Sequence, residues 1–163
     1  SYGSLQRSSR KIAMRYKEFG IWQETTYEDF WLKSNYVSMA LRFFGVESGE
    51  SVAIQSENRP EWFFADIGTQ SIGAVSVGLY PTNPSAEVKY LLSHSESKIL
   101  FAEDQEQVDK ALAVQENLPF NKVSNKSKSK FIVIPCNTAH YWYLDLKKKI
   151  KIPILNMKFI LDW

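Results

Sequence analysis

The stretch "SVAIQSENRPEWFFADIGTQSIGAVSVGLYP", residues 51–81, decides the fold of this chain. Its first eight residues, 51–58, predict a short buried strand: the first four are apolar or small, and the polar group Gln-Ser-Glu-Asn completes the segment. Residues 59–73 predict a helix, with Pro60 suited to the first turn and Gly73 to the end. Residues 74–81 form a near-continuous apolar run, which is typical of a strand buried on both faces of a parallel sheet. Together these three elements predict a β-α-β unit.

The residues after this unit continue the alternation. We expect a helix over 83–95, where Val88, Leu91, Leu92 and Ser95 share one face. A third strand is predicted in "KILFAED", and a polar-faced helix over 104–119, closed by Pro119. A chain that repeats strand and helix in this order favours an α/β fold with a parallel sheet and right-handed crossovers.

The residues before residue 51 predict one more helix. Apolar side chains recur at helical spacing from Tyr27 to Phe44, and Gly45 suits the end of the helix. Thr26 precedes this run, and Asp29 follows three residues later. That spacing resembles a capping box, in which each of the two side chains accepts a hydrogen bond from the backbone N–H of the other residue.

The composition changes near Lys122. Residues 1–122 hold twelve Lys or Arg and sixteen Asp or Glu, whereas 123–163 hold eight Lys, no Arg and two Asp. A Ser/Asn/Lys stretch with little to bury lies between them, which predicts a linker or seam over 123–130. Residues 131–163 then predict a short strand-helix tail. The expected fold is thus an incomplete parallel βαβα layer over 1–122, followed by that tail.

Length and composition narrow the class of protein. The chain has 163 residues, 44% of them hydrophobic, which suits one globular domain. No stretch approaches the roughly 18 apolar residues of a membrane span, and no signal peptide is visible, so the default location is cytoplasmic. A single cysteine excludes an internal disulfide. The net charge of +2 is too small to indicate a nucleic-acid partner.

The usual signatures of catalytic sites are missing from the chain. No glycine-rich phosphate loop of either common pattern occurs among the seven glycines, and no G-x-S-x-G elbow is present. His94 and His140 are isolated and lack the i, i+4 pairing of a helical zinc site, so no metal site is expected. We expect His94 to be exposed or capping, and Trp62, Phe63 and Phe64 to belong to the core.

Residues 11–118 resemble, in order and spacing, the N-terminal part of AMP-forming acyl-CoA synthetases, especially long-chain fatty-acid–CoA ligases. Two motifs carry the resemblance: "TYEDF" from Thr26 to Phe30, and the run from Gly73 to Thr82 that ends in "YPT". The resemblance implies ATP, Mg²⁺ and coenzyme A as cofactors of the intact enzyme, and a fatty acid as substrate. Both motifs are expected to be scaffold, since each is a capped or turning end of an element.

In that family the phosphate loop, the acidic residue that holds the ribose and the catalytic lysine lie further along the chain. None of them matches this sequence, so no ATP-binding residue is expected within it. Adenylyl transfer depends on positioned donors and cations that stabilise charge in the transition state. We therefore expect this chain alone to have no ligase activity.

Residues 131–157 resemble another family, the cofactor-independent aspartate/glutamate racemases. The specific part is "CNTAHYWY", Cys136 to Tyr143. By this resemblance Cys136 would be one of two thiol bases, and Asn137 with Thr138 would bind the carboxylate of an acidic amino acid. Two-base racemisation needs a second group on the opposite face of the α-carbon, and this chain has no other cysteine. Without the resemblance, a lone cysteine after an apolar strand is more simply a buried structural thiol.

Three functional hypotheses follow. The chain is a truncated member of the fatty-acid–CoA ligase family, a racemase fragment that uses Cys136, or a non-catalytic product of a join between the two near Lys122. A strand such as "AVSVGLY" would lack a partner in an incomplete sheet, so self-association through unpaired edges is also expected.

Overall fold

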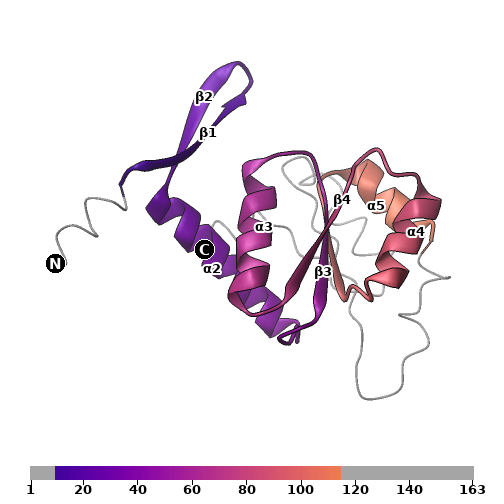
Figure 1. Cartoon of the computed structure of the whole chain (residues 1–163). Helices are drawn as coiled ribbons and strands as arrows, with labels where there is room; N and C mark the ends of the chain where they lie inside the picture. Colours follow the sequence, from indigo (N-terminus) through magenta and orange to yellow (C-terminus); the bar gives the residue numbers. More distant parts are fainter. Residues whose placement is uncertain (1–9, 115–163) are drawn as a thin grey trace.

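The computed structural model describes residues 10–114, and their main body has three layers (Figure 1). The central layer is a parallel sheet of three strands in the order β4-β3-β5. Helices α2 and α3 cover one face of this sheet, and α4 and α5 cover the other (Figure 1). The bounds are α2 Tyr27–Phe43, β3 Ser51–Gln55, α3 Pro60–Ser71, β4 Val75–Leu79, α4 Ser85–His94, β5 Ile99–Ala102 and α5 Gln105–Leu112. The α/β fold with a parallel sheet is confirmed.

The strand order explains why the helices lie on opposite faces. From β3 the chain crosses through α3 to β4 on one side, and from β4 it crosses through α4 past β3 to β5 on the other. Right-handed crossovers that run in opposite directions place their helices on opposite faces of the sheet. The register is regular, with Ser51 beside Val75 and Val52 beside Ile99.

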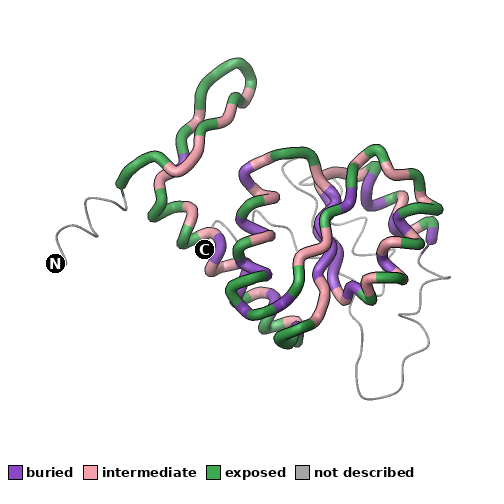
Figure 2. The backbone as a smooth tube through the Cα atoms, in the orientation of Figure 1, coloured by how far each residue is buried: buried purple, intermediate pink, exposed green. Residues whose placement is uncertain are grey.

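The core is divided by β3, the central strand. Val52 and Ile54 point toward α2 and α3, whereas Ala53 points toward α4 and α5. Side chains on the first face include Val37, Leu41, Phe64 and Phe101, and those on the second include Val88, Leu92, Leu100 and Val108. Figure 2 shows buried segments in the sheet and in the helices on both sides of it. A strand with apolar residues on both faces is what helices on both sides require.

The expectation for β4 is wrong in one respect. Its sequence predicted burial on both faces, but only Leu79 is buried and Val75 is 51% exposed. Within residues 10–114, β4 pairs with β3 alone and lies at an edge of the sheet. The apolar run therefore identified a strand correctly, and its edge position agrees with the expectation that "AVSVGLY" would lack a partner; its burial was predicted incorrectly, because burial depends on neighbours that a single strand does not specify.

The predicted capping box of α2 is confirmed. The backbone N–H of Asp29 donates to Thr26 Oγ1 at 3.1 Å, and the N–H of Thr26 donates to Asp29 Oδ2 at 3.2 Å. The Thr26 hydroxyl also donates to Asp29 Oδ2 at 2.7 Å. This hydroxyl, and then the Thr26 N–H, hold the pKa of the Asp29 carboxyl below its ordinary value of 3.8. The cap is thus strongest when Asp29 is ionised.

The last predicted helix is shorter than expected. Helix α5 begins with Asp104 as its N-cap, as the sequence indicated, but it ends at Leu112 rather than near Pro119. Pro119, the linker over 123–130 and the strand-helix tail over 131–163 lie outside the described residues. The domain boundaries near Lys122 therefore stay predictions.

A β-hairpin precedes α2, and the sequence analysis did not identify it. Strand β1 (Ile12–Glu18) pairs antiparallel with β2 (Ile21–Thr26) through a two-residue turn, Phe19-Gly20. Both turn residues have positive φ, +48° and +83°, as in the type I′ turns that join tightly paired strands. The usual signal for such a turn is Asn-Gly or Asp-Gly, and a phenylalanine in that position conceals it.

Helices α2 and α3 approach closely at Gly68. The Ser38 hydroxyl of α2 donates to the Gly68 carbonyl oxygen at 2.9 Å. A Cβ atom placed on Gly68 would lie 2.7 Å from the Ser34 carbonyl oxygen and 2.7 Å from Val37 Cβ. Glycine is therefore the residue that permits this helix contact.

Candidate functional site

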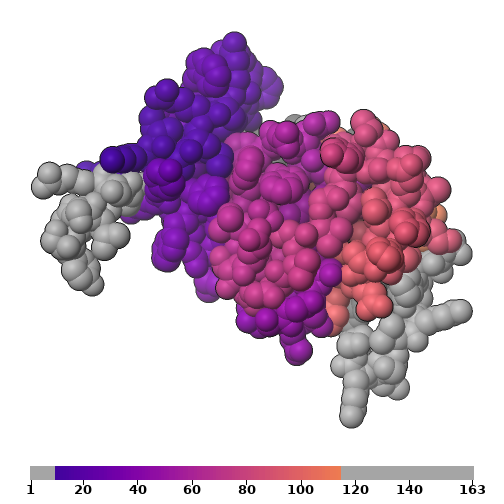
Figure 3. Space-filling view, in the orientation of Figure 1, coloured from indigo at the N-terminus to yellow at the C-terminus, as the bar shows by residue number. Residues whose placement is uncertain are grey.

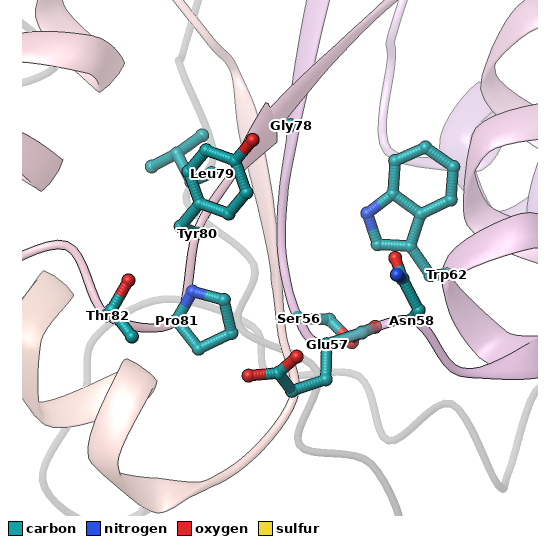
Figure 4. Close-up of a pocket in the computed structure, with 9 residues that line it drawn as sticks. All are labelled: Ser56, Glu57, Asn58, Trp62, Gly78, Leu79, Tyr80, Pro81 and Thr82. Carbon is teal, nitrogen blue, oxygen red and sulfur yellow. Dashed lines mark hydrogen bonds between the residues drawn. The ribbon is translucent and has the colours of Figure 1, made fainter.

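A cavity of about 390 Å³ lies at the carboxyl ends of β3 and β4 (Figure 4). Loops at this end of a parallel sheet are the usual place for ligand sites in α/β folds, because consecutive crossovers leave a crevice there. The lining residues come from the end of β4, from the connections that follow β3 and β4, and from α3. They are Ser56, Glu57, Asn58, Trp62, Gly78, Leu79, Tyr80, Pro81 and Thr82.

Trp62, Gly78 and Tyr80 line this cavity from different sides. Figure 4 shows the Trp62 ring on one side and Tyr80 on the opposite side, with Gly78 between them. A Cβ atom on Gly78 would lie 3.8 Å from Trp62 Cζ2, an ordinary contact distance. Trp62 also packs against the core beneath it. Tyr80 is 77% exposed, so its ring forms an outer wall of the cavity rather than part of the core.

Beside this cavity, Glu103, which follows β5, binds the connection from β3 to α3. Its carboxylate accepts a hydrogen bond from the Glu57 N–H at 2.7 Å and from Arg59 Nη1 at 2.9 Å. The Glu103 N–H donates to the Gln55 carbonyl oxygen at 3.0 Å. These contacts fix the β3–α3 connection, whose residues form one wall of the cavity.

The other wall, the connection from β4 to α4, is held by one hydrogen bond within it and by two residues from other elements. Gln55 Nε2 donates to the Tyr80 carbonyl oxygen at 3.3 Å, and the Asn83 N–H donates to the same oxygen at 3.0 Å. Lys110 Nζ, from α5, donates to the Pro81 carbonyl oxygen at 2.6 Å. Both walls are thereby anchored to the sheet and to α5.

The chemistry of the lining does not suit a nucleotide phosphate. Glu57 is the one charged residue among the nine, and it carries the same sign as a phosphate. Lys and Arg, which bind phosphates in most proteins, are absent from the lining. Across residues 10–114, no group of three or more His, Cys, Asp or Glu side chains is placed to hold a metal ion. ATP and Mg²⁺ therefore do not fit the site that these residues form.

The structure tests several predictions about single residues. His94 is exposed at the end of α4, as predicted, and its ring stacks on Tyr90 with centroids 5.5 Å apart. Of the three aromatic residues expected in the core, Phe64 is buried, Trp62 is half-buried and Phe63 is 43% exposed.

Cys136, Asn137 and Thr138, the candidate racemase residues, lie outside residues 10–114, and their roles stay predictions. His140 lies outside the described part of the chain too.

Sequence reasoning did not single out the cavity itself. It treated the "YPT" motif as scaffold, whereas the structure places Tyr80, Pro81 and Thr82 in the wall of this cavity. A usable signal was present, because two predicted parallel strands followed by polar residues place those residues together at one edge.

None of the helices in the described range is long and apolar enough to cross a membrane.

Comparisons with known proteins identify relatives of this chain. A family model described as "AMP-binding enzyme" matches residues 3–149. The "Long-chain-fatty-acid--CoA ligase heimdall" of Drosophila melanogaster is 36% identical over 98 residues, which are 60% of this chain and 14% of that protein. The "Long-chain-fatty-acid--CoA ligase ACSBG1" of Rattus norvegicus is 28% identical over 121 residues, 74% of this chain and 17% of that protein. The chain thus spans about a sixth of the length of these curated relatives.

Solved structures give the same fold. The anthranilate CoA ligase AuaEII in complex with anthranoyl-AMP superposes with a TM-score of 0.67 and 24% identity, over 82% of this chain and 23% of that one. The Brucella canis acyl-CoA synthetase superposes with a TM-score of 0.70 and 18% identity, over 98% of this chain and 26% of that one. At these identities the likeness shows the fold alone.

The family match also bears on the expected join near Lys122. It continues through residue 149, and so it includes the segment from Cys136 to Tyr143. The racemase resemblance of residues 131–157 gains no support from these comparisons, and neither does the expectation of a join.

Proposed function

Since the chain belongs to the family of AMP-binding enzymes, we propose that it forms part of the N-terminal domain of an AMP-forming long-chain fatty-acid–CoA ligase. The observation that carries this proposal is the 36% identity to a long-chain-fatty-acid–CoA ligase over 98 residues, within a family match of 3–149. The confirmed capping box of "TYEDF" and the helix-strand-turn geometry of residues 73–82 support it.

The reaction proposed for the complete enzyme has two steps. The carboxylate of a fatty acid attacks the α-phosphorus of ATP, which forms an acyl adenylate and releases pyrophosphate. The thiolate of coenzyme A then attacks the acyl carbon and displaces AMP. Both steps build negative charge on phosphoryl or carbonyl oxygens, which cations and N–H donors must stabilise.

The described residues contribute structure to this reaction rather than chemistry. Two of their charged groups at the carboxyl edge of the sheet are engaged with the backbone, Glu103 with the Glu57 N–H and Lys110 with the Pro81 carbonyl oxygen. We therefore assign ATP, Mg²⁺ and coenzyme A to residues outside 10–114. The same reasoning implies that the 163-residue chain alone is inactive. A cytoplasmic location accords with this role and is part of the proposal.

The activity of the chain alone is tested by exchange of labelled pyrophosphate into ATP in the presence of palmitate and Mg²⁺. We expect no exchange above a blank without protein. Palmitate-dependent exchange that persists after further purification would refute the proposed inactivity.

The ligase assignment is tested by a graft. Residues 11–112 of this chain replace the matching segment of the Drosophila ligase, and the chimera is assayed for palmitate-dependent formation of AMP. We expect activity within about one order of magnitude of the parent, because the segment supplies scaffold and no reacting group. The same ligase without the segment serves as the inactive control. A soluble, folded chimera without activity would contradict the assignment.

Self-association through a sheet edge remains part of the proposal. In the described part of the chain β4 is an edge strand, and Val75 on it is 51% exposed. Such an edge offers unpaired backbone groups to a second strand. An elution volume that falls with rising concentration, and recovers in Val75→Lys, is the expected result. A monomeric elution volume at every concentration would exclude this mode.

A further inference from the structure

Gly78 is a glycine that neither the conformation of β4 nor the packing of the described residues requires. Its φ lies outside the left-handed region, and an added Cβ would meet Trp62 Cζ2 at an ordinary contact distance of 3.8 Å. Alternation along β4 places Gly78 on the α3 side of the sheet, since Leu79 packs on the other side. A glycine inside a strand often marks a position that a ligand approaches closely. A larger side chain here would cover the Trp62 ring, so Gly78 keeps that ring open to the cavity of Figure 4.

Tyr80 and Glu57 also line the cavity beside Gly78. The Tyr80 ring is 77% exposed. Glu57 is held through its backbone, since its N–H donates to Glu103, but its carboxylate has no hydrogen bond or ion pair within residues 10–114. Figure 4 shows this carboxylate between the side of the cavity with Tyr80 and the side with Trp62. Two aromatic rings and an unpaired carboxylate therefore line the same hollow.

The charge of this carboxylate is not compensated by the two basic side chains that hold the cavity walls. Arg59, in the connection from β3 to α3, is paired with Glu103 at 2.9 Å. Lys110, which binds the connection from β4 to α4, is paired with Glu106 at 2.8 Å. Residues 27–114, which form the large body of the molecule in Figure 3, hold thirteen Asp or Glu and six Lys or Arg. A positive ligand is attracted both by the carboxylate and by the acidic body around it.

From these observations we propose that the cavity beside Gly78 binds a small organic cation that carries a quaternary or alkylated ammonium group. Aromatic rings attract such cations through the negative charge of their faces, and a carboxylate adds direct charge attraction. The methyl groups of the ligand also bury apolar surface, for which the cavity of about 390 Å³ has room. This inference goes beyond the proposed ligase role and does not depend on it.

Two other kinds of ligand fit the lining less well. A neutral planar ring could stack on Trp62 or Tyr80, but it would leave the charge of Glu57 unused. A divalent metal ion needs several oxygen ligands, and residues 10–114 place no group of three or more His, Cys, Asp or Glu side chains to hold one. An organic cation uses both the rings and the carboxylate.

The experiment compares choline with its neutral isostere, in which a tert-butyl group replaces the trimethylammonium group. Each is titrated into the full 163-residue chain, and binding is followed by saturation-transfer NMR on the methyl protons of the ligand. We expect choline to saturate the chain in the millimolar range. The isostere should bind at least about ten-fold more weakly, because it has the same shape without the charge that the rings and the carboxylate attract.

Two variants locate the site. Glu57→Gln keeps the shape of the lining and should weaken choline binding about ten-fold. Gly78→Val places methyl groups against Trp62 and should abolish binding, while valine suits a strand, so the fold should persist. The matched control is Glu47→Gln, the same change at an exposed residue before β3, at the opposite end of the sheet. Circular dichroism and a thermal melt check that each variant is folded.

The control should bind choline like the parent. Absence of saturation by choline, or equal affinity for the neutral isostere, would overturn the proposal. So would binding that folded Glu57→Gln or Gly78→Val leaves unchanged, because choline would then bind elsewhere on the chain.

Discussion

Replacing Gly68 with alanine tests whether the packing of α2 on α3 determines the stability of this fold. The added Cβ would lie 2.7 Å from the Ser34 carbonyl oxygen, 2.7 Å from Val37 Cβ and 2.8 Å from Val37 Cγ1. Ordinary contacts of a Cβ begin near 3.4 Å, so α3 must move away from α2 by several tenths of an ångström. That movement also lengthens the 2.9 Å hydrogen bond from Ser38 to the Gly68 carbonyl oxygen.

The expected magnitude combines two opposing effects. Overpacking in a close-packed interface costs about 1–3 kcal/mol, and the upper part of this range applies because one of the atoms contacted is backbone. The change from glycine to alanine inside a helix returns about 1 kcal/mol of helix propensity. The net loss of unfolding free energy is therefore about 2 kcal/mol. For a domain of this size, that corresponds to a fall in Tm of about 8–16 °C.

The assay is urea denaturation followed by circular dichroism, with Gly78→Ala as the matched control. At Gly78 the same added Cβ meets Trp62 at 3.8 Å, so stability should be unchanged or rise by up to about 1 kcal/mol. Val37→Ala removes Cγ1, one of the three crowded atoms, so the separate losses of Val37→Ala and Gly68→Ala should sum to more than the loss in the double variant. A Gly68→Ala protein as stable as the parent would refute the close-packing argument.

Three further predictions concern single residues. Asp29→Ala should cost about 1 kcal/mol of unfolding free energy near neutral pH. Because the pKa of Asp29 is lowered in the folded state, its stabilisation of the fold is complete above pH 3.8 and is lost as the pH falls through the folded pKa. The unfolding free energies of parent and variant should therefore converge in acid. A difference that stays constant with pH would contradict the cap. Glu103→Ala should lower the unfolding free energy by about 2–3 kcal/mol, since the Glu57 N–H and the Arg59 guanidinium lose their acceptor. A urea midpoint equal to that of the parent would show that these hydrogen bonds do not stabilise the fold. Finally, NMR after incubation with aspartate or glutamate in deuterium oxide should show the α-proton still in place. Two-base racemisation needs a second group, and Cys136 is the single cysteine of the chain. Deuterium at the α-carbon would restore the racemase hypothesis.

Much of the main body could be predicted from the sequence because its signals are local. The capping pair Thr26 and Asp29 marks the start of α2, and Pro60 and Gly73 bracket α3 and the turn after it. The central strand β3 shows its burial in its own composition, since helices cover both its faces. Each of these features depends on residues within a few positions of one another.

The candidate site was harder to predict because it depends on which elements become neighbours. The cavity wall formed by Tyr80 to Thr82 is fixed by Gln55 and Lys110, which are 25 and 29 residues away from their backbone partners. Nothing in the spacing of these residues indicates that they meet. The hairpin was missed for a related reason, since Phe19 holds a turn conformation that its residue type does not favour.

The sequence by itself determined the order of strands and helices from α2 to α5, the cap of α2 and the family to which this chain is related. Only the tertiary structure decided that Val75 on β4 is exposed, that Glu103 binds the β3–α3 connection, and that Phe19 and Trp22 are exposed on a hairpin. The physical reason is that hydrophobic periodicity and capping act over one or two turns of chain, whereas burial, cavities and charge separation arise from contacts between segments distant in sequence.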